Sequence, residues 1–341
     1  RANANIIKLL SNRILLREET ACFYIYKISS GKKSQTGIAL SASINAYLDN
    51  RIKKHELTRT IKENDRINQI VATKAQTGPV MLAHKHCPAI KQFVHELTSD
   101  NNSDFSGLLD GWKHEIWILS DTDSVNYTNQ LVNSLEGFYI ADGHHRSAAA
   151  AAVKERNLLG TSSDGNGFLA VAFDEKELEI LDYNRVLKTL NSRDHETFFK
   201  KIEKSFHIIE KKEAVYPGDP TSFGLYIDRK WYLLELKNFT PDPLTINNLS
   251  VKILEEHFLK PIIEIHNSRE DDRIDFIGGS RGAEGVVTRV DSGDMQAGIM
   301  VPPTKIEQLF DVADNNQIMP PKSTWFEPKL ADGLLSLSYG K

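Results

Sequence analysis

The sequence predicts an α+β, or mixed α/β, fold divided into two domains. Short runs of β-branched and aromatic residues alternate with segments whose apolar residues recur at helical spacing. A chain of 341 residues with 40% apolar content is long enough to form two cores. The order of elements changes near residues 185–195, so we expect one domain over residues 1–188 and a second α+β domain over residues 189–341.

The first domain is expected to begin with a helix at residues 6–17 and a β-hairpin. Two apolar runs, at 22–28 and 36–40, flank Ser30-Gly31-Lys32, whose glycine suits a tight turn. Residues 161–167, rich in Ser, Gly, Asn and Asp, predict a surface loop. The same patterns predict, in order, helices at 43–50 and 89–97, a strand at 114–119, a helix at 125–135, a strand at 138–141, a helix at 147–158, and strands at 168–173 and 179–182.

The second domain shows a different succession of elements. Gly278-Gly279-Ser280-Arg281-Gly282 predicts a hairpin turn rather than a ligand-binding loop, because glycines favour tight turns. The expected elements are a helix at 196–205, strands at 207–210, 223–228 and 231–236, a helix at 247–259, and strands near Asp275, Val286 and Ile299.

Composition excludes several classes of protein. Lysine and arginine are interleaved with acidic residues and the formal net charge is −4, which argues against a nucleic-acid-binding surface. No apolar run is long enough to span a membrane. Cys22 and Cys87 are the two cysteines, too few for a disulfide framework or a four-cysteine zinc cluster. We therefore expect a cytoplasmic protein with a small-molecule substrate, whose oligomeric state the sequence does not indicate.

The most informative motif is Asp142-Gly143-His144-His145-Arg146, at the junction of the strand at 138–141 and an alanine-rich helix. The first N–H groups of a helix have no internal partner and carry the positive end of its dipole, so this junction suits a phosphate. Arg146 would add a charge-assisted hydrogen bond. The alternative is an ordinary helix start, with Asp142 as N-cap, Gly143 as a turn residue and both histidines in solvent.

Three other segments contain candidate site residues. His55-Glu56 would supply a general base or a metal ligand, although it lacks the second histidine of a zinc-protease helix. Lys322-Ser323-Thr324 resembles the end of a P-loop, but Met319-Pro320-Pro321 precedes it and prolines lack the N–H groups that cradle phosphate. We expect an extended strand that either packs the domains or brings Lys322 to the pocket. Arg185, near the domain boundary, would face a phosphate or hold the interface.

The motif and two further blocks resemble an uncharacterised bacterial and archaeal family, the domain of unknown function numbered 1015. The Asp-Gly-His-His-Arg box is at 142–146, a His-Glu-x-Thr block at 55–58, and a carboxy-terminal signature, Met-Pro-Pro-Lys-Ser-Thr-Trp-Phe-Glu-Pro-Lys, at 319–329. The resemblance covers the chain from about Tyr24 to Leu335. Members of that family usually begin with an extra strand and a Leu-Pro-Tyr-Asp segment, so we expect the amino-terminal part of this chain to be incomplete.

The box is in turn similar to the phosphate-binding box of the ParB and sulfiredoxin superfamily. That superfamily includes partition proteins that bind CTP, sulfiredoxins that use ATP, and free-serine kinases. The resemblance implies a ParB/sulfiredoxin-like nucleotide-binding core in the first domain, with Gly143, His144, His145 and Arg146 holding the phosphates of a nucleoside di- or triphosphate.

The leading functional hypothesis is a phosphotransferase, an ATP- or ADP-dependent kinase of a small hydroxylated metabolite such as serine. Asp142 or Glu56 would hold Mg²⁺ or deprotonate the acceptor, with His55 nearby, and both blocks should line one cleft. Two alternatives remain. One is a ParB-like binding protein switched by a nucleotide without rapid turnover; the other is a metal-dependent hydrolase using Asp142, His144 or His145 with His55.

Overall fold

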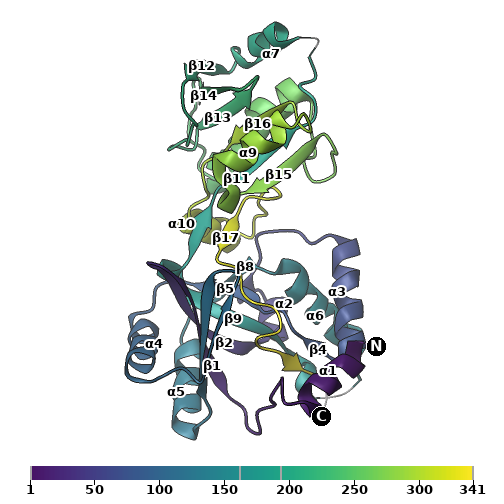
Figure 1. Ribbon diagram of the computed structural model, residues 1–341, viewed down its shortest axis with the longest axis vertical. Coiled ribbons are helices and arrows are strands. Elements are labelled where there is room, and N and C mark those ends of the chain that lie inside the picture. Colours follow the sequence, from purple (N-terminus) through teal and green to yellow (C-terminus); the bar gives the residue numbers. More distant parts are fainter. Residues whose placement is uncertain (1, 161–162, 193, 340–341) are drawn as a thin grey trace. The chain divides into compact units, whose positions relative to one another are not determined.

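The computed structural model describes residues 2–160, 163–192 and 194–339, and its chain forms two compact units (Figure 1). Unit 1 comprises Arg1–Leu178 and Pro328–Lys341, and unit 2 comprises Glu179–Glu327. Each unit combines a mixed set of helices with a sheet, which confirms the predicted α+β class.

The division differs from the expected one at two places. Residues 179–188 belong to unit 2, because β10 (Glu179–Leu181) pairs with β17 (Trp325–Glu327) and β11 (Tyr183–Leu187) is a strand of the unit 2 sheet. The carboxy-terminal segment, expected in the second domain, belongs to unit 1. There β18 (Leu337–Ser338) pairs with β4 (Ala75–Gln76). Long-range strand pairing, which local patterns do not reveal, sets both boundaries.

Unit 1 is built on an eight-stranded sheet with the order β3-β8-β5-β9-β2-β1-β7-β6. Two neighbouring pairs, β3 with β8 and β5 with β9, are parallel, and the other pairs are antiparallel. The central strand β9 is buried at every position because both of its faces are covered. The strands are β1 (Phe23–Ser30), β2 (Lys33–Ser43), β3 (Ile52–Lys53), β5 (Val80–His84), β6 (Phe105–Leu109), β7 (Trp112–Leu119), β8 (Phe138–Asp142) and β9 (Gly167–Asp174).

Helices pack against one face of this sheet. The helix α6 (His144–Glu155) lies on β5 and β9, and its buried alanines allow close packing. Its neighbours are α2 (Ile44–Leu48) and α3 (Thr60–Thr73), while α4 (Pro88–Asp100) packs with α5 (Thr122–Asn133) (Figure 1). The carboxy-terminal segment meets the opposite face, where the Gln35 side chain donates to the Pro328 carbonyl.

Most elements predicted for unit 1 are present, with shifted ends. The first helix, α1, spans Ala2–Ser11 rather than 6–17. The predicted loop at 161–167 lies partly outside the described residues; Ser163–Asn166 forms a 3₁₀ turn, and Gly167 already belongs to β9. The sequence reading missed α3 and β5. Only Ile67 and Ile70 of α3 are buried, and β5 is buried throughout, so neither shows clear periodicity.

Unit 2 contains a six-stranded antiparallel sheet with the order β12-β14-β13-β16-β11-β15. The remaining strands are β12 (Phe206–Lys211), β13 (Ser222–Ile227), β14 (Lys230–Leu236), β15 (Ile274–Gly278) and β16 (Ala297–Met300). The helices are α7 (His195–Ile202), α8 (Ser250–Leu254), which continues as a π-helix over Glu255–Ile263, α9 (Gly282–Asp291) and α10 (Ile306–Asp314).

One predicted strand of unit 2 is wrong. Val286 lies in α9, and the glycine-rich segment before it is a 3₁₀ turn (Gly279–Arg281) that leads into this helix rather than a hairpin turn. The buried residues Ala283, Val286 and Val290 recur at helical spacing, so they form one apolar stripe against the sheet.

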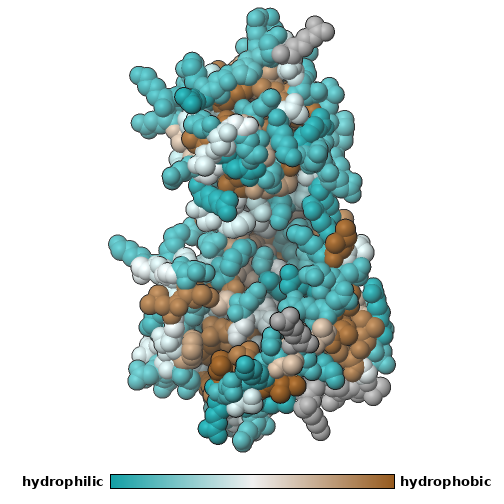
Figure 2. Space-filling view, turned by 45° about the vertical axis from the view of Figure 1, so that its right-hand side comes forward, coloured by the Kyte–Doolittle hydropathy of each residue, from teal (hydrophilic) through white to brown (hydrophobic). Residues whose placement is uncertain are grey.

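The visible surface is mostly hydrophilic, with separate apolar patches (Figure 2). Acidic and basic residues are mixed along the chain, and their numbers nearly balance. Among the described residues, no helix combines the length and the apolar character that crossing a membrane requires.

Candidate functional site

The junction between β8 and α6 has the form that the motif predicts. Gly143 adopts the left-handed conformation, with φ 102° and ψ 24°, and is itself the N-cap of α6. The backbone N–H groups of Arg146 and Ser147 donate to its carbonyl at 2.8 and 3.1 Å, so α6 begins at His144 and not at 147 as expected. Asp142 does not cap the helix: no side chain in the described chain makes the capping hydrogen bond.

The side chain of Arg146 folds back over Gly143. A Cβ atom placed on Gly143 would lie 3.0 Å from both Nε and Nη2 of Arg146. Nη2 donates to Asp142 Oδ2 at 2.8 Å, whereas the buried Nε has no hydrogen-bond partner among the described residues. A buried donor without an acceptor is costly, so this atom identifies a position where an acceptor from a ligand would be stabilised.

Asp142 is held by two cations. Lys329 Nζ lies 3.2 Å from Oδ1, on the other oxygen from Arg146. Burial raises the pKa of Asp142, but the charges of Lys329 and Arg146 outweigh burial and the net pKa is lowered. Asp142 is therefore ionised at neutral pH. Since a cation contacts each oxygen, it is a weak proton acceptor and offers no uncommitted oxygen to Mg²⁺.

The two histidines of the motif point in different directions, as the ~100° step of a helix requires. His145 Nε2 accepts a hydrogen bond from the backbone N–H of Arg59 at 2.9 Å. His144 is buried, and its ring packs edge-on against His55 with centroids 4.5 Å apart. His145 therefore orients the segment before α3, and His144 belongs to the packing beneath the helix start.

The two buried imidazoles are neutral. Burial lowers the pKa of His144 to about 3 and lowers that of His55 well below its usual range, and nearby imidazoles lower both further. Both ring nitrogens of His55 and Nε2 of His144 lack hydrogen-bond partners within the described chain. We expected His144 to neutralise phosphate charge, but a neutral buried ring does not. His55, 1% exposed, is likewise buried and neutral.

The motif and the His-Glu block do meet in space. Because β3 runs parallel to β8, with Ile52 opposite Phe138, the chain leaving β3 reaches the same end of the sheet as Asp142. The contacts of His55 with His144 and of Arg59 with His145 follow from this pairing. Glu56, half-buried, lies between these contacts in the loop before α3.

Arg185 and Lys322 belong to unit 2, whereas the motif belongs to unit 1. Arg185 is buried; its guanidinium donates to the carbonyls of Tyr183 and Lys322 and stacks over Phe276. Burial lowers its pKa to about 10, so it stays charged. Lys322 lies at a positive φ in a turn, not in the extended strand that we expected, and its ammonium group lies over the Tyr183 ring.

The residue that the sequence reading missed is Lys329. It lies in the same carboxy-terminal block as Lys322, but seven residues later, and the block itself was the only signal.

Among the described residues, no group of three or more His, Cys, Asp or Glu side chains is arranged to hold a metal ion.

The sequence matches the family model "Protein of unknown function (DUF1015)" over residues 1–256. No curated protein matches the chain. Among similar solved structures, a conserved hypothetical protein from Pyrococcus furiosus has 13% identity and a TM-score of 0.42, and the match covers 89% of this chain and 96% of that one. A free serine kinase in complex with AMP has 13% identity and a TM-score of 0.42, with 89% of this chain and 93% of that one covered. SbnI with a C-terminal truncation, from Staphylococcus aureus, has 9% identity and a TM-score of 0.45, with 86% of this chain and 85% of that one covered.

Proposed function

The chain belongs to the DUF1015 family of proteins of unknown function, and we propose that this member binds the phosphates of a nucleotide at the start of α6. The observation that carries the proposal is the position of Arg146. Its guanidinium covers the left-handed Gly143 with an unpartnered, buried Nε, beside the N–H groups at the positive end of a twelve-residue helix. Backbone donors, a helix dipole and a guanidinium together suit a phosphate.

The phosphate would compete with Asp142 for its two cations. The carboxylate forms ion pairs with both Arg146 and Lys329, and the Arg146 guanidinium lies over Gly143. A second carboxylate, Asp332, lies beside Gly78, which in turn adjoins the Arg146 side chain. Two cations and two carboxylates leave no net charge, so binding would depend on directed hydrogen bonds, and Mg²⁺ would arrive with the nucleotide rather than be held by Asp142 in advance.

The proposed reaction is transfer of a phosphoryl group from ATP or ADP to the hydroxyl of a small metabolite, as in a serine kinase. Such transfer needs positioning and charge neutralisation more than covalent chemistry. Glu56 is the candidate base for the acceptor hydroxyl, since the contacts of His55 and Arg59 with α6 place its loop beside the motif. The similarity of residues 143–146 to the ParB and sulfiredoxin box agrees with nucleotide binding.

A nucleotide-switched binding protein without rapid turnover is the second candidate. It is favoured by the commitment of Asp142 to two cations, because a carboxylate in that state contributes little to proton transfer. The two candidates share the phosphate site and differ only in chemistry.

A thermal-shift series over nucleoside mono-, di- and triphosphates, with and without Mg²⁺, tests the shared claim. A ligand that binds only the native state raises the melting temperature, and the rise grows with the logarithm of the ligand concentration above its Kd. We expect stabilisation by a nucleoside di- or triphosphate and little by the matching nucleoside. Equal shifts with nucleoside and nucleotide would refute a phosphate site.

A further inference from the structure

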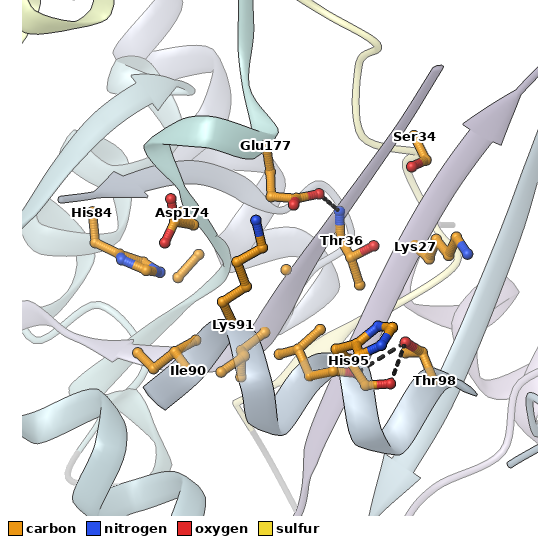
Figure 3. Close-up of a pocket in the computed structure, with 14 residues that line it drawn as sticks. Lys27, Ser34, Thr36, His84, Ile90, Lys91, His95, Thr98, Asp174 and Glu177 are labelled. Atoms are coloured by element: carbon orange, nitrogen blue, oxygen red, sulfur yellow. Dashed lines mark hydrogen bonds between the residues drawn. The ribbon is translucent and has the colours of Figure 1, made fainter. Parts of the chain in front are cut away.

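A pocket of about 230 Å³ opens in unit 1, away from the start of α6 (Figure 3). The strands β1, β2, β5 and β9, helix α4 and the 3₁₀ turn Glu175–Glu177 contribute its walls. Ile38, Ile90 and Val94 form its apolar wall. Ligand sites for drug-sized molecules are usually ~300–1,000 Å³, so this one suits a smaller metabolite.

Strand register separates the pocket from the proposed phosphate site. Met81, at the beginning of β5, pairs with Asp142. His84, at the end of β5, pairs with Asp174 at the end of β9, and both line the pocket. Three residues of an extended strand span ~10 Å. A molecule in the pocket would therefore occupy a second site, and the inference does not rest on the proposed function.

Fixed hydrogen bonds build the rim of the pocket. Asp174 is buried and ionised: Oδ2 accepts from His86 Nδ1 at 2.7 Å and from the backbone N–H of Cys87 at 3.0 Å, and Oδ1 accepts from the backbone N–H of Lys176 at 3.0 Å. Glu177 Oε2 accepts from the backbone N–H of Thr36 at 3.2 Å. These hydrogen bonds fix the start of α4, β2 and the 3₁₀ turn relative to one another, so the rim is preorganised.

The lining offers a ligand several polar groups, among them Lys27 of β1 and three groups on β5, α4 and the 3₁₀ turn. His84 is 98% buried, and its Nδ1 donates to the Lys85 carbonyl at 2.9 Å, so Nε2 carries a lone pair and has no partner in the described part of the chain. Lys91 makes no hydrogen bond or ion pair with any described residue, and its ammonium group extends between Asp174 and Glu177 (Figure 3). The third group is Oε1 of Glu177, which accepts no hydrogen bond from a described residue.

We propose that this pocket binds a small hydroxy acid, with its carboxylate on Lys91, its hydroxyl donating to His84 Nε2 or Glu177 Oε1, and a short alkyl chain against Ile90 and Val94. An ammonium is the group that a carboxylate requires, and the two acceptors require a donor on the ligand. A plain fatty acid would leave those acceptors unpaired, and a neutral alcohol would forgo the charge-assisted hydrogen bond to the ammonium group.

The probe is 2-hydroxybutanoate, followed by amide chemical shifts of the full chain in ¹⁵N–¹H spectra. We expect saturable shifts around β5, β9 and α4, and weaker binding of butanoate. Lys91→Met removes the ammonium group of an exposed side chain and should weaken binding by about tenfold or more, the loss of a charge-assisted hydrogen bond. Lys212→Met, an exposed site in unit 2, is the charge-matched control and should bind as the unaltered chain does.

Glu177→Gln keeps an acceptor for the Thr36 N–H group and removes the charge. It should retain butanoate binding and reduce the preference for the hydroxy acid. Absence of saturable shifts, shifts elsewhere, or equal affinity of Lys91→Met and Lys212→Met would overturn the proposal. Loss of nucleotide binding would leave these readouts unchanged.

Discussion

The imidazole of His55 packs edge-on against that of His144, with ring centroids 4.5 Å apart, in the interior of unit 1. This contact joins the loop after β3 to the first turn of α6, the helix whose start carries the proposed phosphate site. Both rings are buried and neutral, and both nitrogens of His55 and Nε2 of His144 lack partners in the described chain. Protonation of either imidazole would therefore disturb the packing that supports the start of α6.

Stability should fall on acidification below about pH 6.5. Unfolded histidines take up protons near that pH, whereas His144, with a pKa of about 3, and His55 do not, so the unfolded state binds more protons. Each such histidine contributes a slope of ~1.4 kcal/mol per pH unit. Urea unfolding at pH 7.5, 6 and 5 measures it. The pKa values of His84 and His114 are also lowered, so they add to the same slope. His55→Phe should therefore reduce the slope by the contribution of one histidine and not remove it. A flat profile from pH 7.5 to 5 would contradict the buried neutral pair.

Gly143→Ala should destabilise the chain and abolish nucleotide binding. The left-handed φ costs an alanine ~1–2 kcal/mol, and its Cβ would crowd the Arg146 guanidinium at 3.0 Å. Gly160→Ala is the matched control, because Gly160 has a φ of 79° but no described atom within 4 Å of its Cβ position. Both variants bear the backbone cost, and only the first should lose binding in a titration with ADP. Equal affinities in the two variants would separate Gly143 from the site.

Lys329→Met should raise the pKa of Asp142 towards its ordinary value, because it removes one of two cations that lower it. A lowered carboxyl pKa adds stability above about pH 4 that is lost as the pH falls through the native pKa, so the variant should lose stability at pH 7 more than at pH 3. Carboxyl ¹³C titration reports the pKa directly. Lys322→Met, in unit 2, should leave it unchanged. An unchanged pKa in Lys329→Met would remove Lys329 from the cluster.

Glu56→Gln should separate binding from transfer. A base acts only in the chemical step, so the rate of phosphoryl transfer to serine or another small alcohol should fall by ~10²–10⁴, while nucleotide affinity changes little. Radiolabelled transfer beside calorimetric titration gives both quantities. Equal loss in both would make Glu56 a binding residue. If the unaltered chain binds nucleotide without any transfer, the switched binding protein is the correct account.

The sequence predicted the β8–α6 junction because its signal is local: an apolar run, a glycine and a line of alanines follow one another. The hairpin of β1 and β2 has the same kind of signal. By contrast, the ion pair of Asp142 with Lys329 joins residues 187 positions apart and depends on the carboxy-terminal segment returning to unit 1. No local pattern distinguishes Lys329 from Lys322.

Two predictions made from the sequence, for Val286 and His144, differ from the structure for physical reasons. Val286 suggested a strand because β-branched residues favour strands, yet burial of a helical stripe overrode that propensity. His144 was expected to face a ligand because the motif is polar, whereas its ring is buried against His55. Side-chain direction at a helix start depends on the neighbouring loop, which the motif alone does not describe.

Calorimetric titration with ADP of the unaltered chain, Arg146→Met and Arg156→Met tests the central claim most directly. The two arginines lie at opposite ends of α6, so the variants lose the same charge from the same helix. We predict that Arg146→Met raises the Kd about tenfold or more, as expected for a charge-assisted hydrogen bond, and that Arg156→Met leaves it unchanged. Equal affinity of all three proteins, or no binding by the unaltered chain, would contradict a phosphate site at the start of α6.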